Sequence, residues 1–186
     1  RSGRQGALFG YTDQSVDPRI TLTADDPRLQ TYEGLLPGFT WELDLTGPHR
    51  PWVDFLKANG YDVSAGHMHL LATEHERPVE HSVSRFMTDH LIDWLENQTT
   101  TSQTPWFAHA SYLRPHPPYS APRDFTSMYD PADVGMPITP SSSRHPFHDI
   151  LFGVSAVTAP SDEAEMRYMR SQYFAMISAV DAEMGR

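Results

Sequence analysis

Apolar residues recur at helical spacing in two long segments of the chain. In residues 82–97 they follow one another every three or four positions, and Ser82 is a suitable N-cap. This stripe consists of Val83, Phe86, Met87, His90, Leu91, Trp94 and Leu95. Residues 162–185 carry a second stripe, with Ser161 or Asp162 as the cap. Its members are Met166, Met169, Tyr173, Ile177, Val180 and Met184. The spacing predicts two helices, and we expect the second stripe to face the core.

Shorter apolar runs predict two strands and a third helix. Residues 7–11 are typical of a buried strand. Residues 106–112 predict another strand that follows the helix at 82–97, as in αβ alternation. Residues 51–60 predict a short helix, because proline stands in the first turn and Asn-Gly at the end. We expect little regular structure in the segments 20–50, 61–81 and 117–160.

Composition and charge narrow the class of protein. The 186 residues suffice for one domain, and the scattered formal charge of −10 disfavours nonspecific nucleic-acid binding. The chain contains no cysteine, which excludes disulfides and cysteine-ligated zinc within it. No apolar run is long enough to span a membrane. Because the chain begins at Arg1 without methionine and ends directly after an amphipathic pattern, we expect a piece of a larger protein.

Candidate chemistry is concentrated where the second strand ends, in Arg114-Pro115-His116-Pro117-Pro118. Ligands of open α/β sheets bind at the edge formed by strand carboxyl ends. The prolines restrict the backbone around His116, and a positioned imidazole there suits proton transfer or anion binding. The alternative is a rigid surface loop with an ordinary histidine. Arg114 could bind an anion, or could equally pair with an acidic side chain at the surface.

Other polar pairs are weaker candidates. His67 and His69 would share one face of a strand and, with His75, suggest a metal site, but loop histidines are the favoured interpretation. Glu42 and Asp44 alternate with apolar residues and suit a half-exposed strand better than an acid–base pair. His109 lies within the strand and is best interpreted as a buried histidine with its hydrogen bonds satisfied. His145 and His148 lie in a segment that could form a flap over the active site.

Three segments together resemble one family. They are ALFGYTDQSVDPR at 7–19, PWFAHASYLRPHPPYSAP at 105–122 and MRYMRSQYFAMISAVDAEMGR at 166–186. In that order they resemble the central part of a sulfatase-type hydrolase of the alkaline phosphatase superfamily, with the phosphonate monoester hydrolases, which also cleave phosphodiesters, as the most similar branch. Residues 20–100 match only loosely.

The resemblance implies an α/β sandwich with a mostly parallel central sheet flanked by helices. It implies hydrolysis with a formylglycine nucleophile and a divalent metal (Ca, Mn or Mg), whose motifs do not occur in this sequence. Residues 1–186 would then be the central part of a single hydrolase domain, inactive alone, with the N-terminal nucleophile region and the C-terminal metal-ligand region outside it.

The resemblance also assigns individual residues. His116 matches a histidine that contacts the transferred group or the leaving oxygen. Tyr11 matches a substrate-binding tyrosine that replaces the lysine of classical sulfatases, and a neutral donor there favours singly charged esters over dianions. Asp13 is a substrate-binding candidate at a position that is threonine in the phosphonate branch and histidine in sulfatases. Its carboxylate would repel an anion unless it is protonated or paired, so either Asp13 points away from the site or the specificity differs. Arg114 is carried as a further substrate-binding candidate.

The sequence therefore predicts a metal-dependent hydrolase of phosphonate monoesters, phosphodiesters or sulfate esters. An arylsulfatase is the alternative within this class, and a noncatalytic interaction module is the alternative from another class. The expected partner is a small-molecule ester, with no nucleic acid and no membrane, and a homo-oligomer is possible in the full-length protein. The cytoplasm is the expected location, with the periplasm as the alternative.

Overall fold

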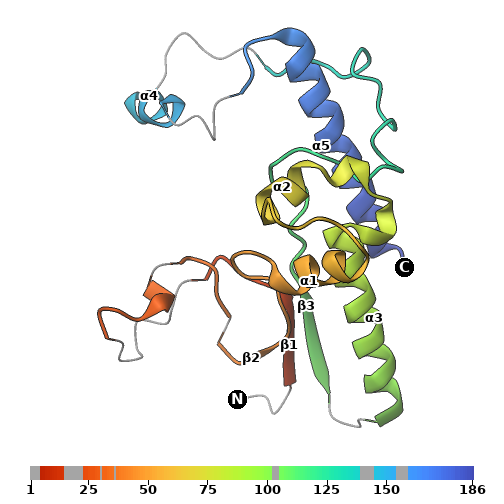
Figure 1. Cartoon of the computed structure of the whole chain (residues 1–186). Coiled ribbons are helices and arrows are strands. Elements are labelled where there is room, and N and C mark those ends of the chain that lie inside the picture. The colour runs from red at the N-terminus through yellow and green to blue at the C-terminus, as the bar shows by residue number, and fades with distance from the viewer. Residues whose placement is uncertain are drawn as a thin grey trace.

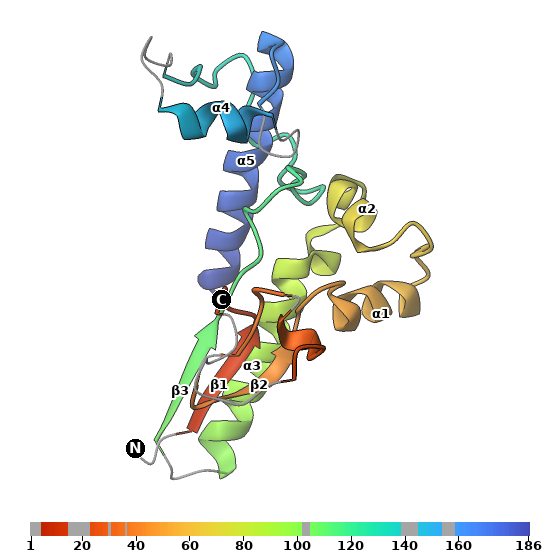
Figure 2. The same ribbon diagram turned by 90° about the vertical axis from the view of Figure 1, so that its left-hand side faces the viewer.

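Three parallel strands form the centre of the protein. The computed structural model describes residues 5–14, 23–29, 31–35, 37–101, 105–138, 145–153 and 159–186. The strands are β1 (Gln5–Gly10), β2 (Phe39–Asp44) and β3 (Trp106–Ala110), in the order β2-β1-β3. Both neighbours of β1 pair with it in parallel, so all three carboxyl ends lie at the same edge, as Figure 2 shows. The predicted α/β class with a parallel sheet is confirmed.

Three helices bury the main core, a long one alongside the sheet and two short ones beyond the carboxyl ends of the strands (Figure 1). They are α1 (Arg50–Ala58), α2 (His67–Ala72) and α3 (Val83–Thr101), and Figure 1 shows α3 running alongside the strands. The core gathers side chains of β1 and β2 with those of the helices, including Phe9, Leu43, Trp52, Leu71 and Met87. The sequence predictions for α1 and α3 are confirmed, and the Ser82 hydroxyl accepts a hydrogen bond from the Arg85 N–H as an N-cap should.

Short helices occupy segments predicted to be irregular. Besides α2, the described residues form three 3-10 turns, η1 (Pro27–Leu29), η2 (Glu74–Glu76) and η3 (Val79–His81), and the helix α4 (Pro146–Phe152). The prediction of little structure in 61–81 is thus wrong. These elements are too short to show a periodic pattern, and α2 forms because Leu70 and Leu71 are buried in the core.

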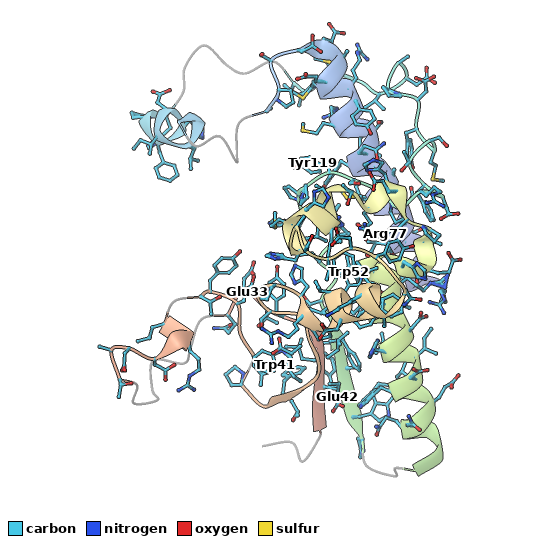
Figure 3. The ribbon with its side chains drawn as sticks, in the orientation of Figure 1. Glu33, Trp41, Glu42, Trp52, Arg77 and Tyr119 are labelled. Carbon is cyan, nitrogen blue, oxygen red and sulfur yellow. The ribbon has the colours of Figure 1, made fainter. Side chains whose placement is uncertain are left out.

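The cluster of short elements is held by a buried arginine. The Arg77 guanidinium lies 5.7 Å from the Trp52 ring and 5.8 Å from the Tyr61 ring, and its pKa is lowered, mainly by burial. It donates to the Leu70 carbonyl. Figure 3 shows Trp52 and Arg77 within this layer, beyond the ends of the strands. These contacts hold the short elements in place next to the sheet edge where ligands are expected.

The helix α5 (Glu163–Met184) packs against α3, but with a different face from the one predicted. Its existence and its Asp162 cap, which accepts from the Glu165 N–H, are confirmed. The predicted core stripe is wrong, because Tyr173, Ile177 and Met184 of that stripe are exposed. The buried positions are instead Ser171, Gln172, Ala175, Met176, Ala179 and Glu183. Among the described residues, no helix is both long and apolar enough to cross a membrane.

Candidate active site

The carboxyl ends of the three strands meet around Gly10. The Gly10 carbonyl accepts from the Leu45 N–H at 3.3 Å, just after β2, and the Ser111 N–H donates to the Phe9 carbonyl at 2.8 Å, just after β3. Gly10 has φ +97, and a Cβ there would clash with the Ser111 carbonyl oxygen. Only glycine fits both constraints. Tyr11 therefore leaves β1 directly beside the segment that leads to His116.

Tyr11 is a half-buried phenol with a raised pKa. Burial raises the pKa to about 12, with smaller contributions from the charges of Glu33, Tyr32 and Asp13. Its ring stacks on the His49 ring, with centroids 6.4 Å apart and planes at 9°. Such a phenol stays protonated across the physiological range and acts as a neutral hydrogen-bond donor.

His49 is a member of this cluster that the sequence did not reveal. It is only 4% exposed and takes a left-handed conformation, φ 51 and ψ 42, immediately before α1. Its Nδ1–H donates to the Leu45 carbonyl at 2.6 Å, and its ring meets His67 edge-on at 5.4 Å. Burial lowers the pKa of His49, which favours the neutral ring. The neutral imidazole lies parallel to the Tyr11 ring and adds no positive charge beside the phenol.

Asp13 and Glu33 place negative charge near Tyr11. A two-way bridge joins the strand end to residue 34, with the Thr12 N–H donating to the Gly34 carbonyl at 3.1 Å and the Gly34 N–H donating back at 2.8 Å. Glu33 lies next to this bridge, is labelled in Figure 3, and accepts from the Gly47 N–H. Asp13 is exposed. Because both carboxylates raise the phenol's pKa, their fields reach the position predicted to bind an anion.

His116 presents one ring nitrogen to solvent. The residue is exposed, and its Nδ1 lies 2.7 Å from the Pro117 carbonyl. A carbonyl only accepts, so Nδ1 carries the hydrogen in this contact and Nε2 is the atom left for a ligand. In the neutral ring Nε2 accepts a proton, and in the charged ring it donates one. The turn can thus offer either a proton acceptor or a cationic donor that can act as an acid at the sheet edge.

Arg114 pairs with a carboxylate, which was one of its two predicted roles, but it does so in the interior and not at the surface. It is 3% exposed, and its Nε donates to Glu74 Oε2 at 2.7 Å. Its remaining nitrogens donate to the carbonyls of Leu71, His116 and Pro118, all within 2.9 Å. These contacts engage the Arg114 donors within the fold and hold the turn, and the assignment of Arg114 to substrate binding stays a prediction.

The other histidine and carboxylate candidates do not form a metal centre. His67 and His69 lie in helix α2 and not in a strand, and the His75 ring contacts the Ser120 hydroxyl at 2.9 Å. Glu42 and Asp44 are exposed on β2, as predicted for a half-exposed strand. In the described part of the chain, no three side chains of His, Asp or Glu are placed to hold a metal ion. The described residues therefore supply no metal site, and the resemblance places the metal ligands outside residues 1–186.

Comparison with known proteins gives consistent relatives. No protein-family model matches the chain. The multifunctional alkaline phosphatase superfamily protein PehA of Trinickia caryophylli is 28% identical over 215 aligned positions, which cover 99% of this chain and 40% of PehA. Iduronate 2-sulfatase of Mus musculus is 29% identical over 112 aligned positions, which cover 53% of this chain and 20% of the sulfatase.

Solved structures point to the same group. Phosphonate monoester hydrolase of Agrobacterium radiobacter superposes with a TM-score of 0.80 at 28% identity, over all of this chain and 41% of that one. Phosphonate monoester hydrolase SpPMH from Silicibacter pomeroyi gives a TM-score of 0.73 at 29% identity, with the same coverage. The chain thus spans about two fifths of the length of PehA and of these two hydrolases. Its homologues are alkaline phosphatase superfamily proteins, and the solved structures it matches are phosphonate monoester hydrolases.

Proposed function

We propose that this chain forms the central part of a single hydrolase domain that cleaves phosphonate monoesters or phosphodiesters. The observation that carries the proposal is the meeting of three parallel strand ends at Gly10, which brings Tyr11 next to the segment leading to His116. The named activity of the similar solved structures supports the same substrate class. The formylglycine nucleophile and the side chains that bind the divalent metal would lie outside residues 1–186.

Tyr11 and His116 have distinct roles in this proposal. The Tyr11 phenol donates a neutral hydrogen bond to an oxygen of the ester anion. His116 Nε2 either stabilises negative charge that grows on the transferred group or protonates the leaving oxygen. Both roles need a ring held in place, which the contact between Nδ1 and the Pro117 carbonyl supplies.

A sulfate-ester hydrolase is the second candidate. The likeness to iduronate 2-sulfatase favours it, although that likeness covers 53% of the chain. Tyr11 argues against it, because the resemblance places lysine there in classical sulfatases and a neutral phenol gives no full positive charge. A noncatalytic interaction module remains the rival from another class, and it predicts no turnover in any form of the protein.

A substrate panel tests the proposal. The enzyme that carries this chain would be assayed with aryl esters of phosphonate, phosphodiester, phosphate and sulfate that share one leaving group. The proposal predicts the highest kcat/KM on the singly charged phosphorus esters. A preference for sulfate would select the sulfatase alternative, and no turnover of any ester would support the noncatalytic module.

A further inference from the structure

Glu74 and Arg114 form a fully buried ion pair behind the turn that carries His116. Glu74 is 0% exposed and Arg114 is 3% exposed. The Arg114 Nη1 group donates to the carbonyls of His116 at 2.9 Å and of Pro118 at 2.7 Å. One guanidinium thus grips the turn at His116 itself and two residues beyond it, with the planar geometry that arginine alone supplies.

Glu74 connects this grip to the rest of the fold. Its Oε2 accepts from Arg114 Nε at 2.7 Å, and its Oε1 accepts from the Val83 N–H at 2.9 Å. Val83 begins α3, the helix that packs on the sheet. The position of the turn is therefore transmitted through two side chains to α3. A second tie comes from Arg114 Nη2, which donates to the Leu71 carbonyl at 2.7 Å.

The main effect of this pair is on geometry and not on net stability. Desolvation of two buried charges offsets their mutual attraction, so such a pair adds little to the free energy of unfolding. A buried charge without its partner is costly, however, and the pair therefore holds one arrangement. His116 has an exposed ring that is hydrogen-bonded to its neighbour's carbonyl, so its direction depends on the backbone of the turn.

We propose that Glu74 is a positioning residue for His116, acting through Arg114 on the backbone of the turn. The proposal rests on the proposed function of His116 and extends it to a residue 42 positions away in the chain (116 minus 74). It also explains why an arginine in the anion-binding neighbourhood faces the interior. Loss of one partner should lower the melting temperature, because a buried charge is left unpaired, and should also move the imidazole away from the position that catalysis needs.

The experiment uses the enzyme that carries the whole chain and the ester that it turns over best. Glu74→Gln removes the charge, and Arg114→Lys keeps the charge but loses the fork to the two carbonyls. We expect each to lower kcat/KM about 10- to 100-fold, as for misplacement of a catalytic group. Val134→Ala is the matched control, because Val134 is a buried apolar residue whose backbone is tied to Arg167 on α5 and not to the turn or to α3. It should lower the melting temperature and leave kcat/KM unchanged.

A double-mutant cycle with His116→Ala separates positioning from general damage. If Glu74 acts through His116, Glu74→Gln should have little further effect on kcat/KM once the imidazole is gone. Equal losses in both backgrounds would overturn the inference, as would wild-type kcat/KM in both Glu74→Gln and Arg114→Lys. If Glu74→Gln fails to fold, Arg114→Lys carries the same cycle. Full activity of His116→Ala would instead refute the proposed function of His116.

Discussion

Substitution of Tyr11 tests how this site distinguishes one negative charge from two. Tyr11→Phe removes only the hydroxyl, and Tyr11→Lys places a positive charge at the end of β1. Because burial raises the Tyr11 pKa to about 12, the wild-type phenol is a neutral donor at every usual assay pH. Tyr11→Phe therefore tests the hydrogen bond and Tyr11→Lys tests the charge, while the His49 ring remains beneath the new side chain.

The expected magnitudes follow from the contacts. A hydrogen bond to a charged acceptor contributes about 1.5–3 kcal/mol, so Tyr11→Phe should lower kcat/KM roughly 10- to 150-fold on a phosphonate monoester. Two unit charges about 4 Å apart interact by about 4 kcal/mol at an effective dielectric constant of about 20. Since Tyr11 is half-buried, screening leaves about 1–2 kcal/mol, and Tyr11→Lys should shift preference toward the dianion roughly 5- to 30-fold.

The assay compares kcat/KM for an aryl phosphonate monoester and for the dianionic aryl phosphate with the same leaving group. Tyr168→Phe is the control, because Tyr168 is a 50% exposed tyrosine on α5. It should behave as wild type on both esters. An unchanged ratio in Tyr11→Lys, or full activity in Tyr11→Phe, would refute the assignment of Tyr11 to the substrate.

Three further substitutions extend the test. His116→Ala should lower kcat/KM about 100-fold or more in steady-state assays, and unchanged turnover would remove His116 from the site. Asp13→Asn should raise kcat/KM on anionic esters roughly 2- to 10-fold at low salt and less at high salt, because a repelling charge is removed; no gain at low salt would contradict this. His49 has a lowered pKa, so the unfolded chain takes up its proton more readily. Its stabilising effect is complete above an unfolded-state pKa of about 6.5 and is lost as the pH falls below it. The melting temperature of His49→Gln should therefore fall less than that of the wild type between about pH 7 and about pH 5. An equal fall in both proteins would contradict a lowered pKa of His49.

The elements with a long periodic pattern could be predicted from the sequence. The helices α3 and α5 and the strands β1 and β3 all form where the spacing of apolar residues indicated them. The buried face of α5 could not, because Gln172 and Glu183 are buried with partners elsewhere in the fold. The buried Ser171 hydroxyl donates to the Tyr168 carbonyl of the same helix. A rule that buries apolar residues and exposes polar ones gives the wrong face in such a helix.

The site shows the same division. The proline-rich turn after β3 is readable as an ordered strand end, and the structure puts it at the same edge as Tyr11. His49 could not be identified from the sequence, because its left-handed conformation has no local signal and its ring contacts Tyr11, which is far away in the chain. For Arg114, the sequence left open whether the guanidinium binds an anionic ligand or an acidic side chain. The acidic side chain that it contacts, Glu74, is 40 positions away. Contacts at such separation leave no local pattern in one sequence.

The central claim is that Tyr11 and His116 bind one and the same ester anion. The most direct test is a crystal structure of the enzyme that carries this chain, with an aryl phosphonate bound. The account predicts phosphonate oxygens at hydrogen-bonding distance, about 2.6–3.2 Å, from both Tyr11 Oη and His116 Nε2. A phosphonate bound elsewhere, with neither side chain in contact, would contradict it.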